Sequence, residues 1–122
     1  MTHHVLIADD QADIRRLLSV TLSKEYALLE AKDGASALDA VRRFNPRVLL
    51  LDIMMPGEMD GLQVLQAIKA DPLTRDTLVV VITARGQASD SQKALQLGAD
   101  AYFVKPFSPL QVLAWIRSHL PS

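Results

Sequence analysis

Five short runs of strand-forming residues, separated by longer segments with helical periodicity, constrain the fold of this chain more than any other feature. The runs are VLIA (5–8), YALLE (26–30), VLLL (48–51), LVVVI (78–82) and AYFV (101–104). The first, third and fourth are continuous and aliphatic, without the polar alternation of a half-exposed strand. Such runs are typical of parallel strands that are covered on both faces.

The segments between these runs are predicted to be helices, because their apolar residues recur three and four positions apart. Ser108 and Pro109 mark the start of the last helix, and Gly98 marks the end of the one before it, which begins near Ser89. The predicted apolar stripes contain Ile14, Leu17, Leu18 and Leu22; Leu38, Val41 and Phe44; Leu62, Leu65 and Ile68; and Leu110, Leu113 and Ile116. Five strand–helix repeats predict an α/β fold, a (βα)5 doubly wound parallel sheet. A closed eight-stranded barrel needs about twice this length.

Composition excludes several classes of protein. Lys and Arg total 13 and Asp and Glu total 14, so the basic excess of a dedicated nucleic-acid binder is missing. The chain has no cysteine, which excludes disulfides and thiolate metal sites. No apolar run approaches the roughly 20 residues of a membrane span. We therefore expect a single cytoplasmic domain over residues 1–122 that binds neither membranes nor nucleic acids directly.

Polar residues stand where four of the five predicted strands end. Asp9 and Asp10 follow the first strand, Asp52 follows the third, Thr83 the fourth and Lys105 the fifth. Ligands of open α/β sheets bind beyond these carboxyl ends, at the point where the strand order reverses. The flavodoxin-like order 2-1-3-4-5 would bring the three aspartates together there, flanked by the threonine and the lysine.

Each of these residues also has a simpler interpretation. Asp10 could be a helix N-cap, Thr83 a turn residue and Lys105 a solvated charge. Together, however, they match one site for a metal ion and a phosphoryl group. Clustered carboxylates repel one another, and a hard divalent cation such as Mg²⁺ relieves that repulsion. An aspartate can itself act as the nucleophile and form an acyl-phosphate.

The segments LIADD, LLLDIMMPG, VVVITA and GADAYFVKPF resemble, in combination and in order, those of bacterial two-component response-regulator receiver domains such as the chemotaxis regulators. The resemblance extends over the whole chain. It implies a signalling switch that assists its own phosphorylation and dephosphorylation, rather than an enzyme acting on a separate substrate.

By this resemblance, each site residue receives a role. Asp52 is the phospho-acceptor, Thr83 binds a phosphoryl oxygen, Lys105 pairs with the phosphate through a cis bond to Pro106, and Tyr102 is the aromatic switch. Mg²⁺ (or Mn²⁺) is held by Asp9, Asp10, Asp52 and the backbone carbonyl of Met54. Met54 and Arg85 border the phosphoryl group and tune its lifetime; Arg85 either reaches over the phosphate or lies in solvent.

The resemblance also implies partners. A histidine kinase or histidine phosphotransfer protein would dock on the first helix, where Leu17 and Leu18 are candidates. A downstream protein or effector domain, or a second copy in a phosphorylation-dependent homodimer, would bind residues 86–119. Lys93, Asp100 and Arg117 resemble dimer positions of the winged-helix subfamily, although Gln111 replaces a glutamate there, and a solvated charged face is the simpler interpretation. Trp115 is either an anchor on this face or part of the core.

One departure from the family pattern lies directly after the phosphorylation site. The family commonly has PGMDG where this chain has PGEMDG, so Glu58 is an insertion that puts the loop geometry in doubt. Two other hypotheses remain at this stage. One is a degenerate receiver that only binds proteins, although all the expected site residues are present. The other is a flavin-binding electron carrier, although DDQAD would repel a phosphate after the first strand.

Overall fold

Five parallel strands lie side by side in one sheet of the computed structural model, which describes residues 3–84 and 88–120. The strands are β1 (His4–Ala8), β2 (Ala27–Ala31), β3 (Val48–Asp52), β4 (Leu78–Thr83) and β5 (Ala101–Val104). Their order is β2-β1-β3-β4-β5, and every neighbouring pair is parallel. This order confirms the predicted doubly wound, flavodoxin-like fold, with the reversal of strand order between β1 and β3.

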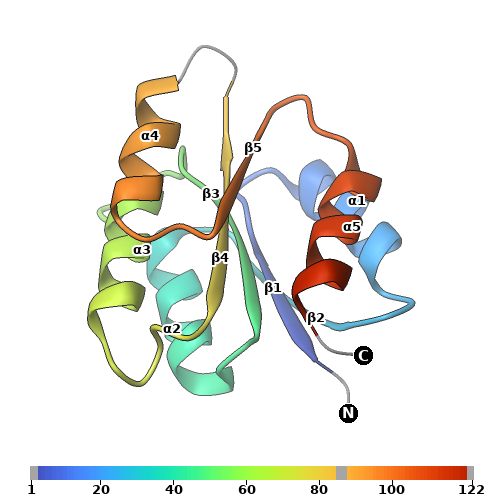
Figure 1. Cartoon of the computed structure of the whole chain (residues 1–122), viewed down its shortest axis with the longest axis horizontal. Coiled ribbons are helices and arrows are strands. Elements are labelled where there is room, and N and C mark those ends of the chain that lie inside the picture. The colour runs from blue at the N-terminus through green and yellow to red at the C-terminus, as the bar shows by residue number, and fades with distance from the viewer. Residues whose placement is uncertain (1–2, 85–87, 121–122) are drawn as a thin grey trace.

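Helices cover both faces of the sheet and make a three-layered molecule. Figure 1 shows α1 and α5 on one face and α2, α3 and α4 on the other. The helices are α1 (Ala12–Leu22), α2 (Gly34–Phe44), α3 (Gly61–Ala70), α4 (Ala88–Gln96) and α5 (Pro109–His119). In the part of the chain that the structure describes, no helix is both long and apolar enough to cross a membrane.

The central strand β3 explains why the aliphatic runs lack alternation. Consecutive strand residues point to opposite faces of a sheet. Leu49 and Leu51 lie in the core beneath α2 and α3, whereas Val48 and Leu50 lie in the core beneath α1 and α5. All four side chains are completely buried. Both faces therefore require apolar residues, as in other parallel sheets covered by helices on each side.

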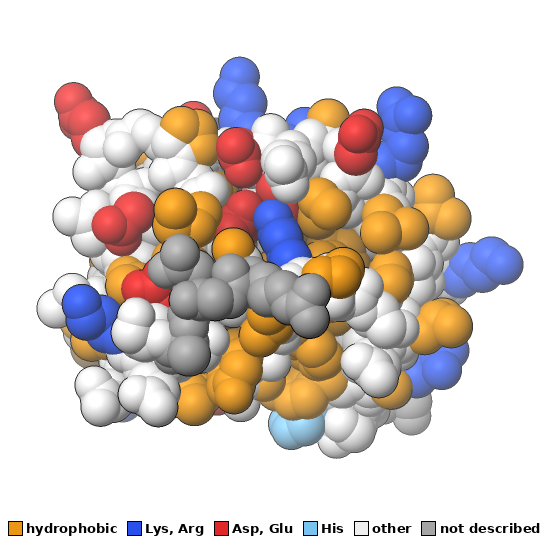
Figure 2. All heavy atoms as spheres, turned by 90° about the horizontal axis from the view of Figure 1, so that it is seen from above, with side chains coloured by type: hydrophobic (Ala, Val, Ile, Leu, Met, Phe, Trp, Pro, Cys, Tyr) orange, Lys and Arg blue, Asp and Glu red, His pale blue; other side chains and the backbone are white. Residues whose placement is uncertain are grey.

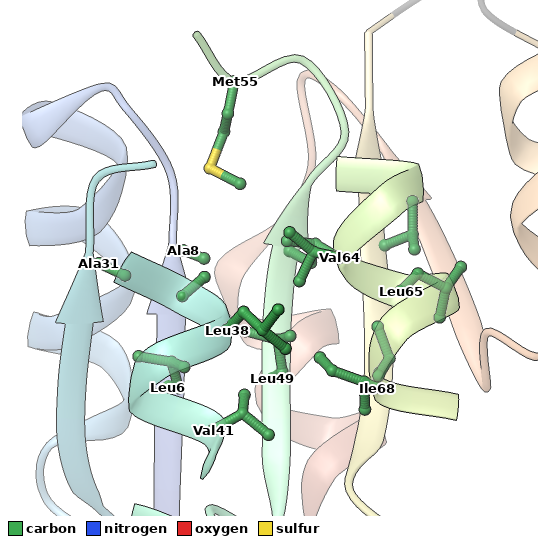
Figure 3. Packing of buried hydrophobic residues seen from close by; sticks show 14 of the residues in the cluster. Leu6, Ala8, Ala31, Leu38, Val41, Leu49, Met55, Val64, Leu65 and Ile68 are labelled. Atoms are coloured by element: carbon green, nitrogen blue, oxygen red, sulfur yellow. The ribbon is translucent and has the colours of Figure 1, made fainter. Parts of the chain in front are cut away.

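The core beneath α2 and α3 supports the end of β3. Figure 3 shows Leu65 and Ile68 of α3 and Leu38 of α2 directed toward the sheet, with Leu6 and Leu49 facing them from the strands. Leu65 and Ile68 are completely buried. This packing holds β3 and the start of α3 in a fixed relation.

One residue from each of the predicted apolar stripes of α2 and α5 is on the surface instead. Phe44 is 53% exposed, because it is the last residue of α2 and the chain turns at Asn45, whose φ is 47°. Leu110 is 70% exposed in the first turn of α5, where Val112 and Ile116 fill the inward positions. The predicted caps of α5 are confirmed: Ser108 accepts a hydrogen bond from the Gln111 amide, and Pro109 is the first helical residue. Three- and four-residue spacing did not show where the apolar stripe of a helix ends.

The start of α1 also differs from one interpretation of the sequence. Its N-cap is Gln11, with no side-chain capping bond, so the interpretation of Asp10 as the cap is wrong. Of the two docking candidates, Leu18 is completely buried and belongs to the core, while Leu17 is 46% exposed. Only Leu17 can meet a partner without unpacking α1.

Candidate functional site

Three carboxylates meet where β1 and β3 end. One oxygen from each of Asp9, Asp10 and Asp52 lies within 4.8 Å of the others. Asp9 and Asp52 are only 1% and 2% exposed, whereas Asp10 faces solvent. Figure 2, which looks onto this end of the sheet, shows acidic side chains gathered beside a basic side chain, with hydrophobic side chains around them. The convergence predicted from the strand ends is confirmed.

Backbone amides orient the two buried carboxylates. The Met54 amide donates to Asp52 Oδ1 at 3.0 Å, and the Gln11 amide donates to Asp9 Oδ1 at 2.8 Å. Arg15 fixes the same segment from α1, since its Nη1 donates to the carbonyl of Asp9 at 2.7 Å. In both carboxylates Oδ1 is therefore occupied by the backbone, and Oδ2 is directed toward the shared space.

Lys105 brings the positive charge to this space from beyond β5. Its Nζ lies 3.2 Å from Asp52 Oδ2 and 3.4 Å from Asp9 Oδ2. It also donates to Gln11 Oε1 at 3.4 Å. The bond between Lys105 and Pro106 is cis, as the family resemblance implied. Lys105 therefore connects strand ends that are 53 and 96 residues away along the chain.

The surroundings of Asp52 disfavour the charged form of its carboxyl group. Burial raises the pKa of Asp52 and the nearby Asp9 charge raises it further, against the opposing Met54 amide and Lys105 ammonium. Burial lowers the pKa of Lys105, but the attraction of Asp52 and Asp9 outweighs burial and raises it. The lysine therefore stays charged, and among the described residues it is the cation that forms ion pairs with the carboxylates of Asp9 and Asp52.

The donor set fits a hard divalent cation. Asp9 Oδ2 is buried without a hydrogen-bond partner among the described residues, although Lys105 Nζ lies within ion-pair distance. A buried carboxylate oxygen without a hydrogen bond is costly, and a bound metal ion would give Asp9 Oδ2 a direct ligand bond in addition to the ion pair with Lys105. Oxygen ligands in a partly open cluster suit Mg²⁺ or Mn²⁺ rather than a soft metal. The cluster of Asp9, Asp10 and Asp52 can thus hold a metal ion.

Thr83 is the last residue of β4, and Tyr102 lies on β5 opposite Val81. Thr83 is buried, and its hydroxyl lies 3.4 Å from the hydroxyl of Ser91 in α4. Tyr102 is 43% exposed, so its ring is largely outside the core. Ser91 was not identified from the sequence; the one signal was a small polar residue three positions before the buried Ala94, on the inward face of the helix.

The loop after Asp52 is anchored at both ends and carries the extra residue between them. A side chain on Gly61 would lie 2.5 Å from the Cα of Ile53 and 2.7 Å from the carbonyl of Asp52, so the first residue of α3 touches the end of β3. Glu58 is exposed and follows Gly57, whose φ of 106° favours glycine. Glu58, the predicted insertion, thus lies on the surface of the loop, at the edge of a groove of about 970 Å³ that Asp10 also lines.

Met54 and Arg85, the two residues predicted to border the phosphoryl group, differ in what the structure describes. The Met54 side chain is 59% exposed and points away from the core. Arg85 lies outside the described residues.

With this geometry known, comparison with known proteins gives the family. Residues 5–117 match the response regulator receiver domain family. The chain belongs to this family. Among similar structures, a putative response regulator from Chloroflexus aurantiacus has a TM-score of 0.89 at 28% identity and is covered over 97% of both chains. The chemotaxis response regulator CheY4 of Vibrio cholerae has a TM-score of 0.88 at 28% identity, covering 98% of this chain and 100% of that one.

Two curated relatives of this receiver domain are longer proteins. The phosphate regulon transcriptional regulatory protein PhoB of Klebsiella pneumoniae is 38% identical, covering 97% of this chain and 52% of PhoB. The probable transcriptional regulator ycf27 of Guillardia theta is 44% identical, covering 95% of this chain and 44% of the relative. The chain thus spans about half the length of the curated relatives it matches.

The charged residues predicted on the 86–119 face of the receiver domain are partly engaged within the chain. Asp100 Oδ2 accepts from Lys69 Nζ at 3.2 Å and from the Val79 amide at 2.8 Å. Arg117 pairs with Glu25 at 2.8 Å. These contacts give Asp100 and Arg117 structural roles without any partner protein.

Trp115 and His119 lie on the same face of α5. Trp115 is partly buried and packs against the core beneath α1 and α5, which agrees with the second sequence interpretation. Its exposed side stacks on His119 with ring centroids 3.9 Å apart. A partner that used Trp115 as an anchor would have to displace this stacked pair.

Proposed function

We propose that residues 1–122 form one receiver domain that accepts a phosphoryl group on Asp52 in a reaction that needs Mg²⁺ or Mn²⁺. The observation that carries this proposal is the pair of buried carboxylates whose Oδ2 atoms share Lys105. Asp52 Oδ2 has its charge partner at 3.2 Å, and Asp9 Oδ2 has no hydrogen-bond partner among the described residues. The proposed nucleophile Asp52, the Lys105 ammonium and a carboxylate oxygen of Asp9 that could bind a metal ion thus lie together where the strands end.

In this reaction Asp52 acts as the nucleophile. Its Oδ2 forms a bond to phosphorus while the bond from phosphorus to the donor's imidazole nitrogen breaks. Phosphoryl transfer depends on alignment and charge neutralisation more than on acid–base groups. The Met54 amide aligns the carboxylate, and the Lys105 ammonium faces the incoming negative charge.

The metal would be held by Asp9, Asp10, Asp52 and the backbone carbonyl of Met54. When bound, it supplies positive charge that offsets the repulsion between the carboxylates and the phosphoryl oxygens. The packing of Gly61 against the end of β3 keeps the loop that contains Met54 in position.

Thr83 and Tyr102 are the residues that would respond to phosphorylation. Phosphorylation adds acceptor oxygens at Asp52, and the Thr83 hydroxyl would donate to one of them. The movement of Thr83 would shift an existing equilibrium in which Tyr102 turns inward. Met54 and Arg85 would border the phosphoryl group and tune its lifetime.

The proposed partners follow from the family. A histidine kinase or phosphotransfer protein in the cytoplasm would approach α1, where Leu17 is exposed. A downstream protein, an effector domain or a second copy of the chain would bind residues 86–119. PhoB and ycf27 are named as transcriptional regulators, but the near-neutral charge of this chain supports no direct contact with nucleic acid.

The test is labelling with acetyl phosphate in the presence of Mg²⁺, followed by intact mass measurement. We expect one phosphoryl group on the unmodified chain, none on Asp52→Asn, and none after removal of the metal with EDTA. Asp39→Asn, which alters an exposed carboxylate on α2, is the matched control and should label normally. Labelling of Asp52→Asn would refute the site. A chain that neither labels nor binds Mg²⁺ would instead be a protein-interaction module.

A further inference from the structure

We propose that Ser91 of α4 is a positioning residue that holds Thr83 in the resting arrangement and thereby opposes phosphorylation. The proposal rests on the function proposed above, in which Thr83 donates to the phosphoryl oxygens at Asp52. Ser91 lies outside the carboxylate cluster, and in this role it would shift the equilibrium between the resting and the phosphorylated arrangement of Thr83.

The contact that carries the proposal joins two buried hydroxyls. Thr83 Oγ1 and Ser91 Oγ lie 3.4 Å apart, and the two residues are 1% and 5% exposed. Among the described residues, Ser91 is the side chain within hydrogen-bond distance of the Thr83 hydroxyl. A buried hydroxyl gains little from water, so the loss of this partner leaves it unsatisfied.

The backbone of Thr83 is fixed independently of this contact. Its carbonyl accepts from the Lys105 amide at 2.7 Å, and the residue ends β4 opposite Val104. Rotation of the side chain or a small shift of α4 therefore decides where the hydroxyl points. The Ser91 contact determines the side-chain position and leaves the strand unchanged.

The attachment of α4 to the sheet is consistent with a movable element. Its described buried residues are Ser91 and Ala94, two small side chains, while Leu95 is 45% exposed. Figure 1 shows α4 on the same face as α2 and α3, beside β4 and near β5. Small inward residues contribute little buried apolar area, and the hydroxyl pair adds a directional contact between this helix and β4.

The two partners of Thr83 compete because a hydroxyl carries a single hydrogen to donate. In the resting arrangement the Thr83 and Ser91 hydroxyls share one hydrogen bond, in which either can be the donor, and the competition arises when Thr83 donates. Once the Thr83 hydroxyl donates its hydrogen to a phosphoryl oxygen at Asp52, it can no longer donate to Ser91. The contact is then lost, or Thr83 only accepts a hydrogen bond from Ser91. An interaction made only in the resting state shifts the equilibrium away from the phosphorylated one.

The experiment uses Mg²⁺ with beryllofluoride, an anion that mimics the phosphoryl group, and measures its affinity by isothermal titration calorimetry. Ser91→Ala removes the hydroxyl at a helical position where alanine is well tolerated. We expect beryllofluoride to bind about 3- to 10-fold more tightly, as the loss of one hydrogen bond from the resting state predicts. Ser91→Thr keeps a hydroxyl and should restore the original affinity. Ser89→Ala, an exposed serine on the same helix, is the matched control and should change nothing.

A double-mutant cycle separates positioning from a general loosening of α4. In a Thr83→Ala background Ser91→Ala should have no effect on affinity, because the two residues act through one contact. Unchanged affinity of Ser91→Ala, or an equal gain in the Thr83→Ala background, would overturn the role of Ser91 while the proposed function stands. Failure of the unsubstituted chain to bind beryllofluoride would overturn both.

Discussion

The two halves of the site are held in the molecule very differently. In the half formed by β1, β3 and α3, the helix buries Val64, Leu65 and Ile68 against the sheet. In the half formed by β4, α4 and β5, the described buried residues of the helix are Ser91 and Ala94. The carboxylates are in the first half, and Thr83 and Tyr102 are in the second.

This difference separates two requirements of a switch. The proposed metal site and nucleophile need fixed geometry, which the Met54 and Gln11 amides and the contact of Gly61 with β3 provide. A responding element needs two arrangements of similar free energy, which a lightly packed helix allows. The comparison predicts that substitutions in the two halves affect different measurements.

The largest expected effect is a loss of stability when a buried residue of α3, the well-packed helix, is shortened. Ile68→Ala should lower the free energy of unfolding by about 2–5 kcal/mol, because it leaves a cavity in a completely buried position. Leu95→Ala, at a half-exposed position of α4, should cost less than about 1 kcal/mol. Urea denaturation of both variants checks the difference. Equal costs would break the comparison between the two helices.

Metal binding should stabilise the chain through the first half of the site alone. At a hundredfold excess over its Kd, Mg²⁺ should raise the free energy of unfolding by about 2.7 kcal/mol. Asp9→Asn should remove most of that gain, whereas Thr83→Ala should keep it. Thermal unfolding with and without EDTA measures both effects, and a Thr83→Ala variant that loses the gain would place the metal elsewhere.

The charge of Asp52 should make the metal-free chain less stable at neutral pH. The pKa of Asp52 is raised in the folded state, so the folded chain binds this proton more tightly than the unfolded chain does. Stability from this group is therefore present at low pH and is lost as pH rises through the folded pKa. Asp52→Asn should therefore be more stable than the unsubstituted chain at neutral pH, with no gain in acid. Urea denaturation across this range tests it, and a pH-independent gain would exclude the titration of Asp52 as its cause.

The smallest expected effect concerns the inserted residue. Glu58→Ala should change stability by less than about 0.5 kcal/mol, because the side chain is exposed on the surface of the loop. Mg²⁺ affinity should also be unchanged, since Glu58 lies outside the carboxylate cluster. Calorimetric titration with Mg²⁺ checks this, and weaker binding would show that the insertion belongs to the fixed half of the site.

The sequence by itself determined the strands and the polar residues at their ends, whereas their order came from the likeness to the flavodoxin-like fold. Aliphatic runs such as VLLL can only be buried on both faces, and the polar residue that ends each run then lies at one edge of the sheet. Helix faces were predicted less well: Phe44 and Leu110 fit an apolar stripe but lie on the surface, because spacing does not show where the sheet stops covering a helix.

Only the tertiary structure decided which atoms of the site are paired. Gln11 and Met54 occupy one oxygen of each buried aspartate, which leaves Asp9 Oδ2 without a hydrogen-bond partner among the described residues. The contact of Thr83 with Ser91 likewise joins a strand to a helix whose serine looks like any other in the sequence. Periodicity specifies the face on which a residue lies, but hydrogen-bond partners depend on distances of a few ångströms between elements, which only packing sets.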